Sequence, residues 1–154
     1  MNRQEVIDKL KESNKTLGTV ESLTGGLVSS TFTSYPGASI FFKGSIVSYS
    51  SLVKRDVLGI KQEVIDEYGV VSNEVAHEMA SKGKKILDVD LCLSFTGNAG
   101  PTVMENKKVG EVYVGFAHEN EIEVYPLLLK GDRNDIREQL VEFSFKILKK
   151  YLGI

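Results

Sequence analysis

The chain has 154 residues, of which 42% are hydrophobic and 26% are charged, and this length and composition are typical of a single globular domain. Its formal net charge of -2 comes from acidic and basic residues mixed along the sequence, which argues against a long nucleic acid as partner. No stretch approaches the roughly 18 consecutive apolar residues of a membrane span, so we expect no membrane partner. The single cysteine, Cys92, excludes an internal disulfide framework and favours a reducing, cytoplasmic location.

The spacing of apolar residues predicts helices and strands along the whole chain. In chain order, we expect a helix at about 2–14, a strand at 16–20, a helix after Gly26, a strand at 43–49, short helices from Leu52 to near Gly59 and at 62–68, a helix at 73–87, strands at 90–96, 109–117 and 123–129, and a closing helix. Ser72 and Asp132 stand where the last two helices need N-caps.

This order of elements predicts a three-layer α/β/α sandwich with a mixed sheet, built as one domain over residues 1–154. Ligands of such sheets usually bind at the carboxyl ends of the strands. Three loops are expected at that edge: the turn at Ser22, the segment 49–54 and the segment 97–101.

Ser22 follows a predicted strand and precedes the turn Leu23-Thr24-Gly25-Gly26, where a helix begins with unpaired backbone N–H groups. A serine there can attack a carbonyl carbon while the N–H groups of residues 24–26 stabilise the resulting oxyanion. The alternative is that Ser22 or Thr24 only caps the helix, which is a common role for these residue types.

Tyr49 and Lys54 lie where the next strand ends and a short helix begins. A serine nucleophile needs a base, and a lysine whose pKa is lowered by burial can serve, with tyrosine as a proton donor or relay. The alternative is that Tyr49 is a half-buried strand aromatic and Lys54 a solvated charge.

The segment Thr96-Gly97-Asn98-Ala99-Gly100-Pro101 is an apolar strand that ends in a loop interrupted by glycines. Such loops can bind phosphate through backbone N–H groups, or can simply be tight turns. Arg133 could add a guanidinium for a phosphate, or lie on the surface of the last helix. His77 and His118 have no metal-site spacing, so we expect no metal.

Several motifs in this order resemble the CinA C-terminal domain family over essentially the whole chain. They are Val20-Glu21-Ser22-Leu23-Thr24-Gly25-Gly26, Tyr35-Pro36-Gly37-Ala38-Ser39, Val47-Ser48-Tyr49-Ser50, Gly69-Val70-Val71-Ser72, Thr96 to Pro101, Val109-Gly110 and Gly131-Asp132-Arg133. The resemblance implies a nicotinamide mononucleotide deamidase that needs no cofactor. It also implies that the serine of the family's Glu-Ser motif is Ser22, and that its tyrosine and lysine are Tyr49 and Lys54.

The chain departs from the family pattern at three places. Leu23 stands where relatives commonly have cysteine, Asn98 where they have isoleucine, and residues 102–106 replace a glycine-rich run. We expect these departures to affect how a small nucleotide substrate is held more than the reaction itself.

We hypothesise that neutral Lys54, assisted by Tyr49, takes the Ser22 proton during attack on the carboxamide. One alternative is a nucleotide-binding or regulatory module with little turnover, and a weaker one is an interaction protein of competence or DNA-damage responses. A homo-oligomer is also expected, because compact α/β domains commonly pair.

Overall fold

The computed structural model describes all 154 residues. Its elements are α1 (Arg3–Glu12), β1 (Leu17–Glu21), α2 (Leu27–Thr33), the 3-10 helix η1 (Ala38–Ile40), β2 (Phe42–Val47), α3 (Ser51–Asp56), α4 (Gln62–Tyr68), α5 (Asn73–Leu87), β3 (Leu91–Gly97), β4 (Glu111–His118), β5 (Glu121–Leu128) and α6 (Arg133–Leu152). Every helix and strand that the sequence predicts is present, with ends that differ by a few residues. The 3-10 helix alone was not predicted.

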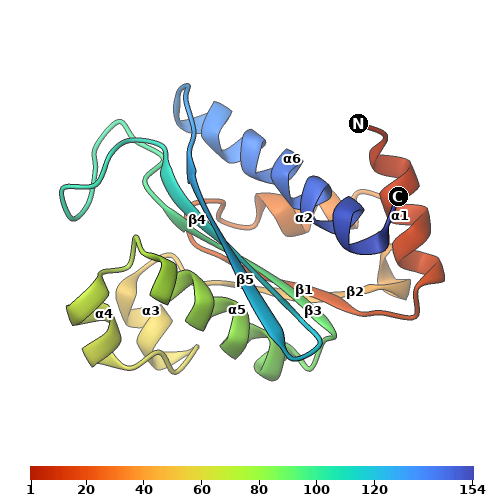
Figure 1. The fold of residues 1–154 in the computed structure, drawn as a ribbon, viewed down its shortest axis with the longest axis horizontal. Helices are drawn as coiled ribbons and strands as arrows, with labels where there is room; N and C mark the ends of the chain where they lie inside the picture. The colour runs from red at the N-terminus through yellow and green to blue at the C-terminus, as the bar shows by residue number, and fades with distance from the viewer.

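The five strands form one mixed sheet in the order β2-β1-β3-β4-β5. β1 pairs in parallel with both β2 and β3, whereas β4 pairs antiparallel with β3 and β5. Helices α1, α2 and α6 cover one face of the sheet, and α3, α4 and α5 lie on the other (Figure 1). The predicted three-layer α/β/α sandwich is therefore confirmed.

The central strand β3 separates two hydrophobic cores and is buried along its whole length. Leu91, Leu93 and Phe95 belong to the core under α1, α2 and α6, whereas Cys92 belongs to the core under α5. Successive side chains of a strand point to opposite faces, so a strand covered on both faces must be apolar at nearly every position. This is why the unbroken apolar run predicted a central strand.

Side-chain caps fix the starts of the two longest helices. The Ser72 hydroxyl accepts a hydrogen bond from the N–H of Val75 at the start of α5. At the start of α6, Asp132 accepts from the N–H of Asp135, and the Asp135 carboxylate accepts from the N–H of Asp132. Both predicted N-caps are confirmed, and the second is a reciprocal capping box.

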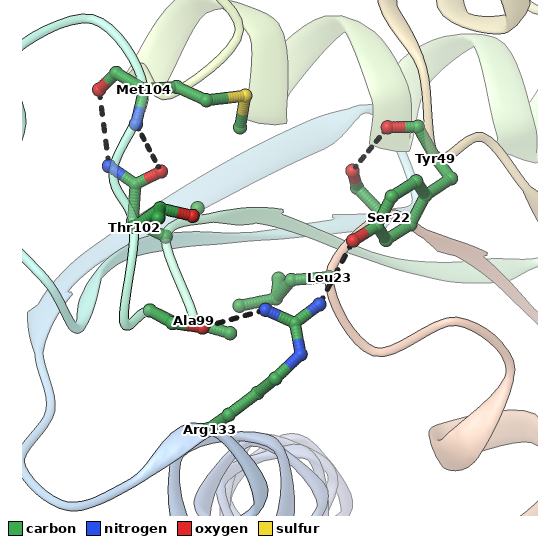
Figure 2. Close-up of a pocket in the computed structure, with 10 residues that line it drawn as sticks. Ser22, Leu23, Tyr49, Ala99, Thr102, Met104 and Arg133 are labelled. Atoms are coloured by element: carbon green, nitrogen blue, oxygen red, sulfur yellow. Dashed lines mark hydrogen bonds between the residues drawn. The ribbon is translucent and has the colours of Figure 1, made fainter.

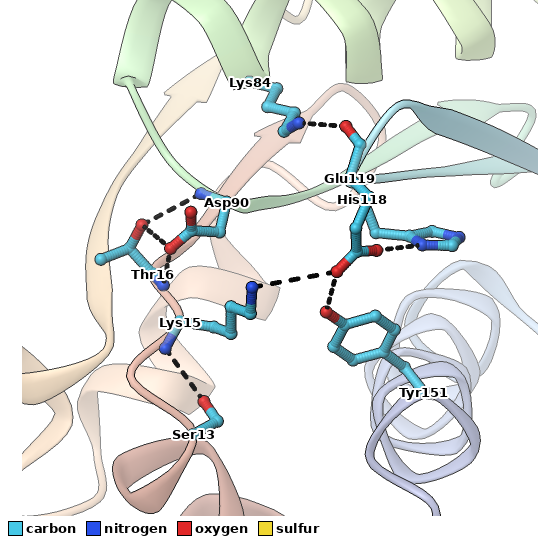
Figure 3. Close-up of polar contacts among 8 residues, drawn as sticks. All are labelled: Ser13, Lys15, Thr16, Lys84, Asp90, His118, Glu119 and Tyr151. Carbon is cyan, nitrogen blue, oxygen red and sulfur yellow. Dashed lines mark hydrogen bonds and ion pairs between the residues drawn. The ribbon is translucent and has the colours of Figure 1, made fainter.

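Polar side chains connect the β4–β5 turn to neighbouring elements (Figure 3). This turn lies at the opposite end of the sheet from the Ser22 turn, because His118 pairs with Leu91 at the start of β3, whereas the N–H of Ser22 donates to Phe95 near its end. The Glu119 carboxylate contacts His118 Nδ1 at 2.7 Å and accepts a hydrogen bond from the Tyr151 hydroxyl at 2.6 Å. Its backbone carbonyl accepts from Lys84 at 2.6 Å.

No group of three or more His, Cys, Asp and Glu side chains is arranged to hold a metal ion. None of the helices combines the length and the apolar character that crossing a membrane requires.

Candidate active site

The carboxyl ends of the parallel strands β1, β2 and β3 meet at one edge of the sheet, as predicted. A pocket with a volume of about 180 Å³ lies there (Figure 2). It is lined by Ser22, Leu23, Tyr49, Gly97, Asn98, Ala99, Gly100, Thr102, Met104 and Arg133. The three loops that the sequence singled out therefore surround one cavity.

Ser22 and Lys54 are in direct contact beside this pocket. Ser22 follows the last residue of β1, and its Oγ atom lies 2.9 Å from Nζ of Lys54 in helix α3. Nζ also donates a hydrogen bond of 2.7 Å to the backbone carbonyl of Ser48. The Lys54 side chain is only 1% exposed, so it is not the solvated surface charge that remained an alternative.

The surroundings of Lys54 make its neutral form easier to reach. Burial lowers the pKa of Lys54 from 10.5 to about 8, because the charged amine loses its hydration, and the nearby Glu105 carboxylate partly opposes this shift. A neutral amine has a free electron pair and can accept the proton of a hydroxyl. The Ser22 hydroxyl also lies 3.4 Å from the backbone carbonyl of Tyr49, at the long limit of a hydrogen bond.

The phenol of Tyr49 lies on the wall of the pocket and interacts with Arg133. The Tyr49 hydroxyl accepts a hydrogen bond of 2.9 Å from Arg133, whose guanidinium also donates 2.8 Å to the carbonyl of Gly100 (Figure 2). That hydroxyl makes no hydrogen bond with Ser22 or Lys54. Arg133, the first residue of α6, thus connects the Tyr49 loop with the 97–101 loop beside the pocket.

Glu21, which the sequence analysis did not single out, organises the turn that carries Ser22. Its fully buried carboxylate accepts hydrogen bonds from the N–H groups of Gly26, Val28 and Ser29, at 2.9–3.1 Å. Glu21 therefore caps the N-terminus of α2. The Ser22 side chain takes no part in this capping. An acidic residue at the end of a buried strand is a usable signal, because a buried carboxylate requires donors and the next helix start supplies them.

The backbone of this turn leaves two N–H groups free. The N–H of Gly25 donates to the carbonyl of Ser22, and the N–H of Gly26 donates to Glu21. Those of Leu23 and Thr24 donate no hydrogen bond within the chain. Among the N–H groups of residues 24–26, which were expected to stabilise an oxyanion, only that of Thr24 is unpaired. The N–H of Leu23, which was not among them, is also unpaired.

The structure brings part of the predicted substrate-binding set together. Gly97, Asn98, Ala99, Gly100 and Arg133 line the pocket, but Thr24, Gly25, Gly26 and Thr96 do not. The buried Thr96 hydroxyl instead donates to the carbonyl of Val70 at 2.6 Å, which ties β3 to the start of α5. Thr102 and Met104 line the pocket without having been predicted to do so, because nothing in the sequence shows how their loop folds back.

Comparisons with known proteins agree with this architecture. The family model described as the CinA C-terminal domain matches residues 2–152. A CinA-like protein of Petrotoga mobilis is 42% identical over 153 residues, covering 96% of this chain and 38% of that protein. One of Sulfurihydrogenibium sp. is 40% identical over 151 residues, covering 97% and 38%. The chain thus spans less than two fifths of the length of these curated relatives.

The fold also matches solved structures. A competence or damage-inducible protein from Enterobacter asburiae superposes with a TM-score of 0.94 at 28% identity, covering 97% of this chain and 95% of that one. A protein of the competence-damaged protein superfamily from Enterobacter cloacae superposes with a TM-score of 0.93 at 26% identity, covering 97% and 89%. Both sequence and structure relatives therefore extend over nearly the whole of this chain.

Proposed function

We propose that this chain, which belongs to the CinA C-terminal domain family, hydrolyses the carboxamide of nicotinamide mononucleotide to nicotinic acid mononucleotide and ammonia. The observation that carries the proposal is the 2.9 Å contact between Ser22 Oγ and the buried amine of Lys54 at the edge of a pocket. A nucleophile in contact with a base of lowered pKa is the arrangement that acyl transfer requires. The substrate identity rests on the resemblance of the motifs to the family's deamidases.

The proposed reaction has two stages. Neutral Lys54 takes the Ser22 proton as Oγ bonds to the carboxamide carbon, and the carbonyl oxygen becomes an oxyanion. In this proposal the oxyanion is stabilised by the N–H groups of Leu23 and Thr24, which donate no hydrogen bond within the chain. Lys54 then returns the proton to the leaving nitrogen, ammonia departs, and an acyl ester remains on Ser22. Water attacks the ester, and its proton passes through Lys54 back to Ser22.

Tyr49 and Arg133 have supporting roles in this proposal. The Tyr49 phenol holds the Arg133 guanidinium. The Ser22 hydroxyl, which makes a long 3.4 Å contact with the backbone carbonyl of Tyr49, turns toward neutral Lys54 to give up its proton. The guanidinium lies at the pocket wall, where it can bind a phosphate through charge-assisted hydrogen bonds. We place the reaction in the cytoplasm, a location that fits the single, fully buried thiol of Cys92.

Ammonia release from nicotinamide mononucleotide by the purified chain tests the proposal, with free nicotinamide and simple amides run in parallel. We expect activity on the mononucleotide and its loss in Ser22→Ala. Ammonia release by Ser22→Ala at the rate of the unmodified chain would remove Ser22 as the nucleophile. Tight mononucleotide binding without any ammonia would favour a nucleotide-binding or regulatory module instead.

A further inference from the structure

All three places where the chain departs from its family's pattern meet at the pocket, Leu23 among them. Residues 102–106 replace the glycine-rich run, and Asn98 stands in the loop that precedes them. Thr102 and Met104 line the pocket on the side opposite Ser22 and Tyr49 (Figure 2). The segment 102–106 therefore forms one wall of the cavity, although most of its surface faces solvent.

The Asn98 side chain holds this wall from within the pocket. Its amide nitrogen donates to the backbone carbonyl of Met104 at 3.3 Å, and its amide oxygen accepts from the Met104 N–H at 3.1 Å. Asn98 is 2% exposed. An apolar side chain at this position would have no means of pairing with both backbone groups of Met104.

Glu105 holds the same segment from its other end. Its carboxylate accepts hydrogen bonds from the N–H groups of Val70 and Val71, at 2.9 and 3.0 Å. The carboxylate comes so close to Gly69 that a Cβ there would lie 2.6 Å from an oxygen atom, so the absence of a side chain at Gly69 makes the contact possible. Glu105 and Asn106 adopt left-handed φ angles of 61° and 55°, which residues with side chains rarely do. These hydrogen bonds hold the segment in a conformation that its backbone does not favour by itself.

We infer that Asn98 and Glu105 are positioning residues that hold residues 102–106 against the pocket, so that the Met104 side chain supplies an apolar face for the aromatic ring of the substrate. This inference rests on the proposed function and names the part of the substrate that this wall recognises. Leu23, Tyr49 and Ala99 also give the pocket apolar surface, and Met104 adds an apolar side chain on the wall opposite Ser22 and Tyr49. A flexible thioether packs well against the edge or face of an aromatic ring.

The dimensions of the site agree with recognition of the ring alone. The pocket volume of about 180 Å³ is below the roughly 300 Å³ at which small-molecule pockets usually begin. A second cavity of about 560 Å³ adjoins it, shares Ala99, Gly100 and Arg133 with it, and includes residues 131–134. In the inferred arrangement the ring occupies the smaller pocket, whose lining includes Ser22 and Met104, and the ribose and phosphate extend past Arg133 into the larger cavity.

Binding measurements separate the ring contact from the rest of the ligand. Calorimetry with nicotinamide mononucleotide and with ribose 5-phosphate, which lacks the ring, is carried out on Ser22→Ala so that no turnover interferes. Met104→Ala and Glu105→Ala are added to this background. Val103→Ala is the matched control, because Val103 lies in the same segment and does not line the pocket. Glu105→Gln keeps one acceptor oxygen and serves as the conservative variant.

We expect Met104→Ala and Glu105→Ala to weaken mononucleotide binding about fivefold, which corresponds to the typical strength of a sulfur–aromatic contact. Val103→Ala should stay within about twofold of the unmodified background, and Glu105→Gln should lie between the two. Ribose 5-phosphate affinity should not change in any variant. Hydrogen exchange at the Val70 and Val71 amides should become faster in Glu105→Ala, because both lose their acceptor.

Equal mononucleotide affinities for Met104→Ala and Val103→Ala would overturn the ring contact, and so would absence of mononucleotide binding in the Ser22→Ala background. Unchanged exchange at Val70 and Val71 in Glu105→Ala would overturn the positioning role. Melting temperatures of all variants identify any that fail to fold. If the mononucleotide binds as expected but the unmodified chain releases no ammonia, the proposed hydrolysis fails and the ring contact stands.

Discussion

Lys54 Nζ lies 2.9 Å from Ser22 Oγ although the two residues are 32 positions apart in the sequence and belong to different elements. Ser22 is held at the end of β1 by the buried Glu21 carboxylate, and Lys54 is held in α3 by its hydrogen bond to the Ser48 carbonyl. Both partners are therefore fixed before any substrate binds. Proton transfer between fixed groups needs little reorganisation, which is the physical basis of the pH and mutational effects expected below.

The activity should rise with pH as Lys54 loses its proton. Because burial lowers the pKa of Lys54 to about 8, kcat/KM for nicotinamide mononucleotide should increase about tenfold between pH 7 and pH 9 and then level off. The Glu105 carboxylate raises this pKa, so Glu105→Gln should move the midpoint to lower pH. Initial rates of ammonia release over pH 6–10 measure both effects. A profile that falls over this range would exclude a neutral lysine as the base.

Replacement of Lys54 by methionine should separate activity from stability. Lys54→Met should reduce kcat at least about a hundredfold, as expected for loss of a general base. The pKa of Lys54 is about 8 in the folded state, below its ordinary value of 10.5. Burial of the charged amine therefore destabilises the fold, fully so below pH 8, and this destabilisation disappears as pH rises to 10.5. The unfolding free energy of the unmodified chain, relative to Lys54→Met, should therefore increase across this interval. Urea unfolding at pH 7.5 and pH 10 measures the difference, and a decrease would contradict the buried amine.

Arg133→Met should weaken binding of the phosphate. We expect KM for nicotinamide mononucleotide to rise about tenfold or more, since hydrogen bonds to charged groups contribute about 1.5–3 kcal/mol. The riboside, which lacks the phosphate, should show no comparable change in KM. Tyr49→Phe removes the hydroxyl that Arg133 contacts and should produce a smaller increase of the same kind. Equal effects of Arg133→Met on the mononucleotide and the riboside would show that Arg133 does not bind phosphate.

The sequence predicted the sheet and its helices because burial of one or both faces gives each element a characteristic spacing of apolar residues. β3 is buried on both faces and was recognisable from its apolar run, and α5 and α6 from their helical spacing and their caps at Ser72 and Asp132. The meeting of three strand-end loops followed from the parallel pairing of β1 with its neighbours. Long-range order in this fold is thus encoded in local patterns.

Side-chain partners at the site were less predictable, because each depends on how an irregular segment turns. Lys54 lies in a helix of six residues, which is too short for its periodicity to show that the amine is buried. The contact of Tyr49 with Arg133 joins residues 84 positions apart, and the Glu105 carboxylate reaches Val70 from a loop 35 positions away. Motif resemblance pointed to Ser22, Tyr49 and Lys54 together. It included Glu21 in the serine motif and Met104 in the altered run 102–106, but it gave neither residue a role.

Glu21→Gln should destabilise the Ser22 turn. The Glu21 carboxylate accepts hydrogen bonds from three backbone N–H groups and from the Thr19 hydroxyl. In a glutamine side chain, an NH2 group would replace one of the two accepting oxygens and would face these donors without an acceptor. We expect the unfolding free energy to fall by about 1–3 kcal/mol, measured by urea unfolding, together with a lower kcat. Glu63→Gln on the exposed surface of α4 is the matched control and should change neither quantity. Equal stability of the two variants would show that Glu21 does not hold the turn.

His118 should make stability depend on pH independently of the site. Burial lowers the pKa of His118, but hydrogen bonds with Glu119 (Figure 3) and with Glu123 outweigh burial and raise this pKa above 6.5. A raised pKa means that the stabilisation is complete below pH 6.5 and is lost as pH rises through the folded-state value. Because both carboxylates are partly exposed, we expect less than about 1 kcal/mol. The difference in unfolding free energy between the unmodified chain and His118→Gln should be larger at pH 6 than at pH 8.5. A difference that grows with pH would mean that the imidazole is held neutral rather than paired with these carboxylates.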